Sequence, residues 1–201
     1  MLEGRKKSVI GVSVLLSLLL AFVGWTGLEE LFAANWVAQG NRFYQEGKYD
    51  EALGAYQKAS VDRPEAPFLY FNEGNVFYKK GDYRKAIESL EKAALKAKDL
   101  SREARANYNI GNCHFSEARG QESDPKKALE GLQQSIRFYR QALDLDPEMK
   151  EAAHNLEVAR LLVKDLLDKI KKQQEEQQKQ QEEMKKIVEE LARLLEKQQK
   201  A

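Results

Sequence analysis

The chain has 201 residues with 33 Lys and Arg against 32 Asp and Glu, and this formal net charge of +1 predicts no nucleic-acid partner. Only 4 Pro and 12 Gly beside 32% charged residues favour long amphipathic helices and disfavour a β-sandwich or barrel. The single cysteine excludes an intrachain disulfide and, with only two histidines, gives no zinc-type ligand spacing, so no metal or cofactor is expected.

The first predicted element is a membrane-targeting segment. Residues 8–25 contain no ionisable side chain, and residues 1–7 before them include Arg5, Lys6 and Lys7. A helix of this length extends about 27 Å, which is near the short end of what spans a bilayer core. The basic flank predicts that residues 1–7 are cytoplasmic, that residues 8–25 are a transmembrane anchor, and that the rest of the chain lies across the membrane.

The same segment also fits a secretory signal peptide, which would end in a cleavage site between small residues. The best candidate site, Leu31-Phe32-Ala33, lies well beyond the apolar stretch. Residues 26–29 form a capping-box pattern that starts a helix through this site, which favours an uncleaved anchor. Cleavage stays open as the alternative, and both readings export the body of the protein.

The body of the chain is an internal repeat. Gly40, Gly74 and Gly111 are 34 and 37 residues apart, and each precedes an asparagine and, one helical turn later, aromatic side chains. A glycine inside a helix costs up to about 1 kcal/mol, so its recurrence indicates that another helix passes too close for a Cβ. The repeating units cover residues 26–66, 67–103 and 104–149.

This pattern resembles the tetratricopeptide repeat (TPR), which implies an all-α solenoid of about three helical hairpins over residues 33–149. Gly47 and Gly81 are expected to end the first helix of a hairpin, and Pro64 and Pro147 to stop the second. The residues expected to let the helices pack closely are Gly40, Ala52, Ala59, Gly74, Ala86, Ala93, Gly111 and Ala142.

From Gly111 to Ser135, which takes the place of Ala52, the third unit has twelve more residues than the first unit has from Gly40 to Ala52, and the extra residues are roughly 120–131. Asp124 and Pro125 fit an N-cap and a first helical turn, so a loop and a lengthened second helix are expected. Residues 150–172 begin like a fourth repeat but have Glu157 in place of the packing glycine. This substitution indicates a terminal capping helix.

The last segment, residues 173–201, is a tail rich in Gln, Glu and Lys. Heptads counted from Leu156 stay in phase as far as Leu194, which predicts one helix of about fifty residues together with the capping helix. Its apolar residues near the end are Met184, Ile187, Val188, Leu191, Leu194 and Leu195. We expect a solvated tail; self-association, a partner helix and a membrane surface are the alternatives.

The sequence contains no nucleotide-binding glycine loop, nucleophile elbow or carboxylate pair that the repeat does not explain, so no enzyme is expected. Cys113 falls where the repeat buries a small residue, which predicts a packed thiol. His114 takes the place of Phe43 and Phe77 and is expected to pack, and His154 has no catalytic companion in the sequence.

A binding surface remains, because the first helices of stacked TPR hairpins line a concave groove. The residues expected there are Val37, Asn41, Tyr44, Phe71, Asn72, Asn75, Tyr78, Arg105, Tyr108, Asn109 and Asn112. Asparagine amides donate and accept hydrogen bonds, which suits an extended peptide. Some TPR proteins grip a C-terminal carboxylate with two asparagines and three basic residues, but Val37 and Asn109 replace two of those bases here.

The whole layout is similar to the TPR proteins of the bacterial aerotolerance (Bat) group: an anchor, three Gly-Asn repeats, the helix HNLEVARLLV and a Gln/Glu/Lys tail. This resemblance implies a non-enzymatic scaffold, single-pass in the bacterial inner membrane with its repeats in the periplasm, whose partners are von Willebrand factor A domain proteins. Two alternatives stay open: a periplasmic chaperone or envelope-assembly factor with several clients, and a structural protein that oligomerises through its C-terminal helix.

Overall fold

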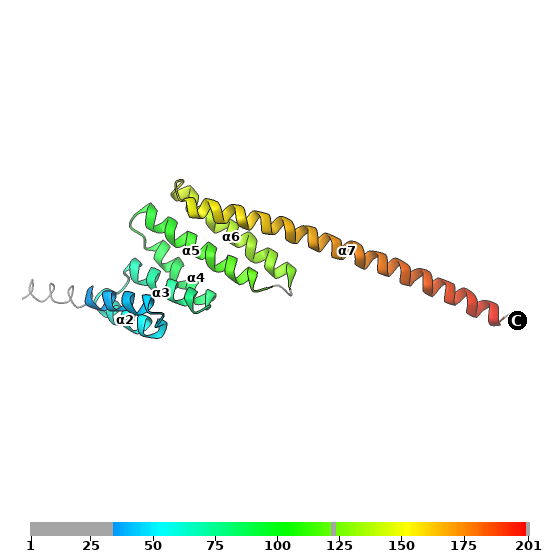
Figure 1. Cartoon of the computed structure of the whole chain (residues 1–201), viewed down its shortest axis with the longest axis horizontal. Coiled ribbons are helices and arrows are strands. Elements are labelled where there is room, and N and C mark those ends of the chain that lie inside the picture. Colours follow the sequence, from blue (N-terminus) through cyan, green and yellow to red (C-terminus); the bar gives the residue numbers. More distant parts are fainter. Residues whose placement is uncertain (1–33, 122–123, 200–201) are drawn as a thin grey trace, which may run out of the picture. The chain divides into compact units, whose positions relative to one another are not determined.

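The computed structural model describes residues 34–121 and 124–199, and the regular structure in these ranges is helical (Figure 1). The predicted cytoplasmic end, the anchor at residues 8–25 and the capping-box pattern lie outside the described residues. Among the described helices, none combines the length and the apolarity that crossing a bilayer requires.

The chain divides into two compact units between Cys113 and His114. The first unit contains the helical residues 34–45, followed by the helices that pair into hairpins. These are α2 (Tyr49–Asp62), α3 (Pro67–Lys79), α4 (Tyr83–Leu95) and the part of α5 (Leu100–Arg119) that ends at Cys113. The predicted boundary between residues 103 and 104 falls inside α5, because that helix already begins at Leu100.

Glycine lets the helices of the first two hairpins approach closely. A Cβ at Gly40 would lie 2.5 Å from a ring carbon of Tyr56, and one at Gly74 would lie 2.6 Å from Cγ of Leu90. Both distances are too short for real carbon atoms, so glycine is required at these two points by sterics and not by backbone conformation. Gly111 is buried in α5.

The turns follow the sequence signals. Gly47 and Gly81 have φ angles of 75° and 76°, in the left-handed region where glycine has no steric penalty. Helix α2 ends at Asp62, just before Pro64, and α6 ends at Leu145, just before Pro147. The predicted helix stops are therefore confirmed.

Alanines and larger apolar side chains together fill the contacts inside the hairpins. Ala52, Tyr56, Ala59, Leu69 and Val76 form one buried cluster in the first unit. Of the other packing positions, Ala86, Ala93 and Ala142 are also buried. Burial of apolar area, at about 25 cal/mol per Å², is the main favourable contribution to this kind of packing.

The second unit contains the end of α5, α6 (Pro125–Leu145) and α7 (Lys150–Gln199). Asp124 caps α6, since its side chain accepts a hydrogen bond from the backbone N–H of Lys127, as the sequence predicts. The extra residues predicted at about 120–131 follow the end of α5 at Arg119 and include the start of α6, and α5 is itself longer than α3, with 20 residues against 13. Gly131 of α6 lies against Ala118 near the end of α5, so the two helices are in contact there.

Helix α7 is one continuous helix of 50 residues, which confirms the predicted length and joins the capping helix to the tail. Its first turns pack against α6 and bury Ala152, Leu156 and Ala159. From residue 171 to residue 198 every side chain is exposed. The single ribbon of α7 continues past the end of α6 in Figure 1.

Candidate functional site

The predicted groove residues lie on the first helices of the hairpins, all within the first compact unit. The exposed ones are Asn41 and Arg105, and the half-buried ones are Val37, Tyr44, Phe71, Asn72, Asn75, Tyr78, Tyr108, Asn109 and Asn112. They are therefore neither core residues nor fully solvated ones, which is the environment of a recognition surface.

Four of the groove asparagines form two separate hydrogen-bonded pairs, each between successive repeats. Nδ2 of Asn72 donates to Oδ1 of Asn41 at 3.4 Å, and Nδ2 of Asn109 donates to Oδ1 of Asn75 at 2.7 Å. We call Asn41, Asn72, Asn75 and Asn109 the amide ladder. An amide has four hydrogen-bonding positions, so one bond between neighbours leaves capacity for a peptide backbone.

A buried tyrosine, Tyr56, holds Asn41 of the amide ladder in place. The hydroxyl of Tyr56 donates to Oδ1 of Asn41 at 2.8 Å. Burial raises the pKa of Tyr56 to about 12, so this hydroxyl stays a donor at neutral pH. The residue that fills the space above Gly40 therefore also orients a groove amide.

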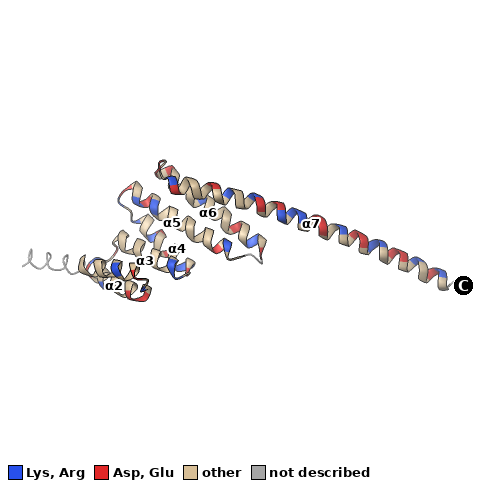
Figure 2. Cartoon of the chain, viewed as in Figure 1, with Lys and Arg blue, Asp and Glu red and all other residues tan. Residues whose placement is uncertain are grey.

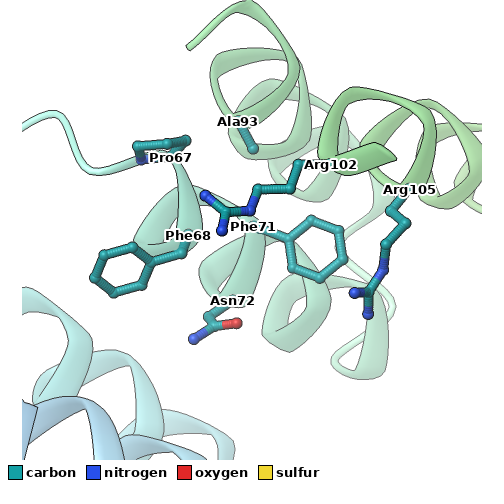
Figure 3. A pocket seen from close by; sticks show the side chains of 7 residues that line it. All are labelled: Pro67, Phe68, Phe71, Asn72, Ala93, Arg102 and Arg105. Carbon is teal, nitrogen blue, oxygen red and sulfur yellow. The ribbon is translucent and has the colours of Figure 1, made fainter. Parts of the chain in front are cut away.

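A pocket of about 250 Å³ adjoins the ladder at Asn72 (Figure 3). Helices α3, α4 and α5 supply its walls: Pro67, Phe68, Phe71, Asn72, Ala93, Arg102 and Arg105. Phe68 is 37% exposed although it is a large apolar residue. We call these seven residues the aromatic-arginine pocket.

Two guanidinium groups give this pocket a positive charge. The guanidinium carbon of Arg105 lies 5.7 Å from the ring centroid of Phe71, within cation–π distance. Nε of Arg102 lies 3.3 Å from a carboxylate oxygen of Asp99, an exposed contact that leaves most of the guanidinium fork available. A planar guanidinium can donate two hydrogen bonds to a carboxylate, and the phenylalanine rings beside it offer apolar surface. The pocket therefore suits an acidic residue of a ligand that has an apolar neighbour.

The sequence predicts only some of the residues that line this pocket. It identified Phe71, Asn72 and Arg105 but missed Arg102, which lies one turn before Arg105 on α5, and Phe68, which lies one turn before Phe71 on α3. Residues three or four apart share a helix face, so extending each groove position by one turn would have found both. In the sequence, Asn109 stands where some TPR proteins have a basic residue, so the groove was expected to lack that positive charge. Arg102 supplies a second positive charge to the pocket.

Two groove tyrosines occupy equivalent places at the ends of their helices. Tyr44 lies against Tyr49 with ring centroids 5.9 Å apart, and Tyr78 lies against Tyr83 at 5.7 Å. Burial raises the pKa of Tyr44. These pairs close the turns of the first two hairpins, so both rings have a packing role in addition to any contact with a ligand.

The candidates for chemistry are packed side chains. Cys113 is buried, and the ring of His114 stacks on Phe138 with centroids 5.5 Å apart. Burial lowers the pKa of His114, which favours its neutral form. Within residues 34–121 and 124–199, no three His, Cys, Asp or Glu side chains are placed to hold a metal ion.

Comparison with known proteins identifies the repeats. Residues 40–81 match the family model described as TPR repeat, and residues 71–123 match the one described as tetratricopeptide repeat. The chain contains tetratricopeptide repeats. A search of curated proteins gives no significant match.

Solved structures share the TPR fold at low sequence identity. The first TPR of Spaghetti (RPAP3), bound to the HSP90 peptide SRMEEVD, is 22% identical with a TM-score of 0.54, covering 66% of this chain and 94% of that one. The second TPR domain of human RPAP3, in complex with the HSP70 peptide SGPTIEEVD, is 20% identical with a TM-score of 0.51, covering 67% and 98%. The Hsp90 co-chaperone Cns1 from Saccharomyces cerevisiae is 23% identical with a TM-score of 0.63, covering 76% and 46%.

Proposed function

We propose that the TPR domain is a non-enzymatic adaptor that binds an extended acidic segment of a partner protein. The observation that carries this proposal is the aromatic-arginine pocket beside the amide ladder. The ladder offers hydrogen bonds to a peptide backbone, and Arg102 and Arg105 offer charge-assisted bonds to a carboxylate. The rings of Phe68 and Phe71 offer apolar area for a neighbouring side chain.

The peptides bound by two structures of the same fold support an acidic ligand. SRMEEVD and SGPTIEEVD both end in Glu-Glu-Val-Asp and carry Met or Ile before the two glutamates. An apolar residue next to carboxylates has the chemistry that the aromatic-arginine pocket would accept. Because Val37 and Asn109 are uncharged, we propose that Arg102 and Arg105 recognise acidic side chains within the segment, with no requirement for a free C-terminus.

The finer proposal concerns location and partner. Residues 8–25 would anchor the chain in a bacterial inner membrane, with residues 1–7 in the cytoplasm and the repeats in the periplasm, or would be cleaved during export. The resemblance to the Bat group supports membrane-bound von Willebrand factor A domain proteins as partners. A reporter enzyme fused after Ala201 should be active only outside the cytoplasm, and activity inside would contradict this topology.

Photo-crosslinking from the pocket tests the adaptor proposal. A photoreactive residue at Phe68 in the full chain should capture one predominant protein in cells, whereas the same residue at Leu95, which is 85% exposed on α4, should not. Replacing Arg102 and Arg105 together by glutamine should abolish the capture, and Arg84→Gln, at an exposed site outside the pocket, should preserve it.

The captured proteins discriminate the alternatives. A predominant von Willebrand factor A domain protein supports the Bat-type role, and another single protein supports the adaptor but contradicts that role. Many proteins whose capture falls by graded amounts in the double arginine variant would indicate a chaperone with several clients. Equal capture from Phe68 and Leu95 would contradict a role for the pocket.

A further inference from the structure

The last turns of α7 carry an apolar face that packs against nothing in the described residues. We call it the tip stripe, and it consists of Met184, Ile187, Val188, Leu191, Leu194 and Leu195. These six side chains are 53–60% exposed. An exposed contiguous row of large apolar residues at helical spacing marks an interaction site.

The tip stripe is separated from the packed part of α7 by a polar helix. The heptad core positions between them hold Gln173, Gln177 and Gln180, all exposed. Lysine and glutamate pairs recur around them, and Nζ of Lys171 lies 3.9 Å from a carboxylate oxygen of Glu175. Figure 2 shows the two charges alternating along this part of α7. Such pairs stabilise a helix locally, so the segment acts as a spacer that needs no partner.

The charges beside the tip stripe restrict what can cover it. Counted from Met184 as heptad position a, the stripe occupies positions a, d and e. Glu183, Glu190 and Lys197 are spaced by seven residues and therefore form one edge of the stripe, at position g. In a pair of helices the g residues meet g residues only when the helices are antiparallel.

We propose that the tip stripe binds the tip stripe of a second copy of this chain as an antiparallel helix pair. When Met184 faces Leu194 of the second copy, Ile187 faces Leu191, and the same contacts repeat by symmetry. In this register Glu183 lies beside Lys197 of the other copy at both ends of the contact. At the centre of the contact, Glu190 lies beside Glu190 of the other copy. The two attractive Glu183–Lys197 pairs outweigh this one repulsive pair.

The parallel arrangement fits these residues less well. A continuous parallel pair would place Gln173, Gln177 and Gln180 against their own copies in the core. It would also put Glu183 beside Val188, where the carboxylate loses water without gaining a partner. The antiparallel overlap covers the whole tip stripe and leaves the glutamine segment in solvent.

A membrane surface fits less well than a second copy. Helices that lie on membranes carry Lys and Arg around the apolar face, because biological surfaces are anionic. Here Glu183 and Glu190 border the stripe together with Lys197 on one edge and Lys185 on the other, so the border is mixed in charge and not predominantly basic. The proposed self-association uses a surface separate from the aromatic-arginine pocket, so it stands independently of the proposed function.

Cysteine pairing between differently tagged copies of the full chain tests both the partner and the orientation. One copy carries Met184→Cys and the other Leu194→Cys, and the two are co-expressed and oxidised in cells. The antiparallel pair predicts a cross-linked heterodimer from the mixture and no cross-link from either variant alone. The unsubstituted chain, whose Cys113 is buried, is the control.

Each other result overturns the proposal. Absence of any cross-link shows that the stripes do not meet, and a cross-link to another protein shows a different partner. Homodimers from each single variant show a parallel arrangement.

A charge exchange provides a second test that does not depend on packing. Lys197→Glu should lower the heterodimer yield about threefold to tenfold, because both end pairs become repulsive. Adding Glu183→Lys in the same chain should restore the yield. Lys186→Glu changes the charge equally on the face away from the stripe and should have little effect. Equal losses in Lys197→Glu and Lys186→Glu, or no rescue, would overturn the proposed register.

Discussion

The hairpins of residues 40–95 and the exposed part of α7 are both helical, but different interactions stabilise them. In the hairpins, α3 packs on α4 at Gly74, where Ala86 and Leu90 of α4 are buried. In α7 no side chain between residues 171 and 198 is buried, so the helix there depends on intrinsic propensity and on charge pairs between successive turns. Secondary structure alone therefore does not reveal which interactions hold a helix.

Glycine has opposite effects in the two regions. At Gly40 and Gly74 a neighbouring side chain occupies the space of a Cβ, so the packing gained compensates for the lower helix propensity of glycine. The exposed part of α7 contains no glycine, and one introduced there would reduce helix propensity with no gain in packing.

The largest expected effect is that of Gly74→Ala. Its Cβ would meet Cγ of Leu90 at 2.6 Å and the backbone oxygen of Ala86 at 3.2 Å, and the backbone cannot rotate away. We expect a loss of about 1–3 kcal/mol in unfolding free energy, measured by chemical denaturation of the first unit.

The matched control is Gly54→Ala in α2, where nothing lies within 4 Å of the new Cβ. Without a clash, alanine should stabilise the helix by about 0.5–1 kcal/mol. If both substitutions shift stability in the same direction, close approach of the helices is not the reason for Gly74.

The next effect is that of a glycine placed in the tail. Gln178→Gly should cost about 1 kcal/mol of local helix stability, which corresponds to roughly fivefold faster amide hydrogen exchange around residue 178. The unfolding of the hairpins should not change, because Gln178 is exposed. A fall in hairpin stability would instead show that the tail packs on other parts of the chain. Gln178→Ala is the control and should slow the exchange.

Added salt should change amide exchange differently in the hairpins and in the exposed part of α7, and the difference should be smaller than the effects of the substitutions above. The contact of Lys171 with Glu175 at 3.9 Å lies in the exposed part of α7 and is therefore screened by ions. Raising sodium chloride to about 1 M should remove about 0.3–0.5 kcal/mol per pair and speed amide exchange in the tail. Exchange in α3 and α4 should slow or stay constant, because salt does not weaken apolar burial. Equal acceleration in both regions would contradict this assignment.

The sequence predicts features that depend on local or periodic signals. Gly47 and Gly81, Pro64 and Pro147, and the cap at Asp124 identify helix ends because each acts through its own backbone or the next turn. The length of α7 follows from an unbroken heptad phase.

The aromatic-arginine pocket was only partly predictable, because its walls come from three helices. Phe71 and Arg105 follow from motif positions, whereas Phe68 and Arg102 enter the pocket because of how α3 and α5 are rotated against each other. The approach of Gly131 of α6 to Ala118 of α5 is likewise a contact between helices, which no local signal predicts.

The smallest expected effect concerns Glu65, in the turn between the first two hairpins. This residue has a φ of 72°, and its carboxylate contacts the ammonium of Lys96 and accepts a hydrogen bond from the hydroxyl of Tyr70 at 3.2 Å. The hydrogen bond from Lys96 and the positive charge of Lys96, followed by the hydrogen bond from Tyr70, lower the pKa of Glu65. These contacts hold a left-handed residue that glycine would adopt more easily.

Glu65→Gln should therefore lower the thermal midpoint of the hairpins at neutral pH by a small amount. A carboxyl whose pKa is lower in the folded state stabilises the fold above its ordinary pKa of about 4.3 and loses that effect as the pH falls through the folded value. The difference between Glu65→Gln and the unchanged chain should thus shrink as the pH is lowered from neutral into the acidic range, while Glu91→Gln, at an exposed site on α4, should have little effect at either end of that range. A difference of the same size at every pH would mean that Glu65 stabilises the turn through the shape of its backbone and uncharged contacts, and that its charge has no part in joining the first hairpin to the second.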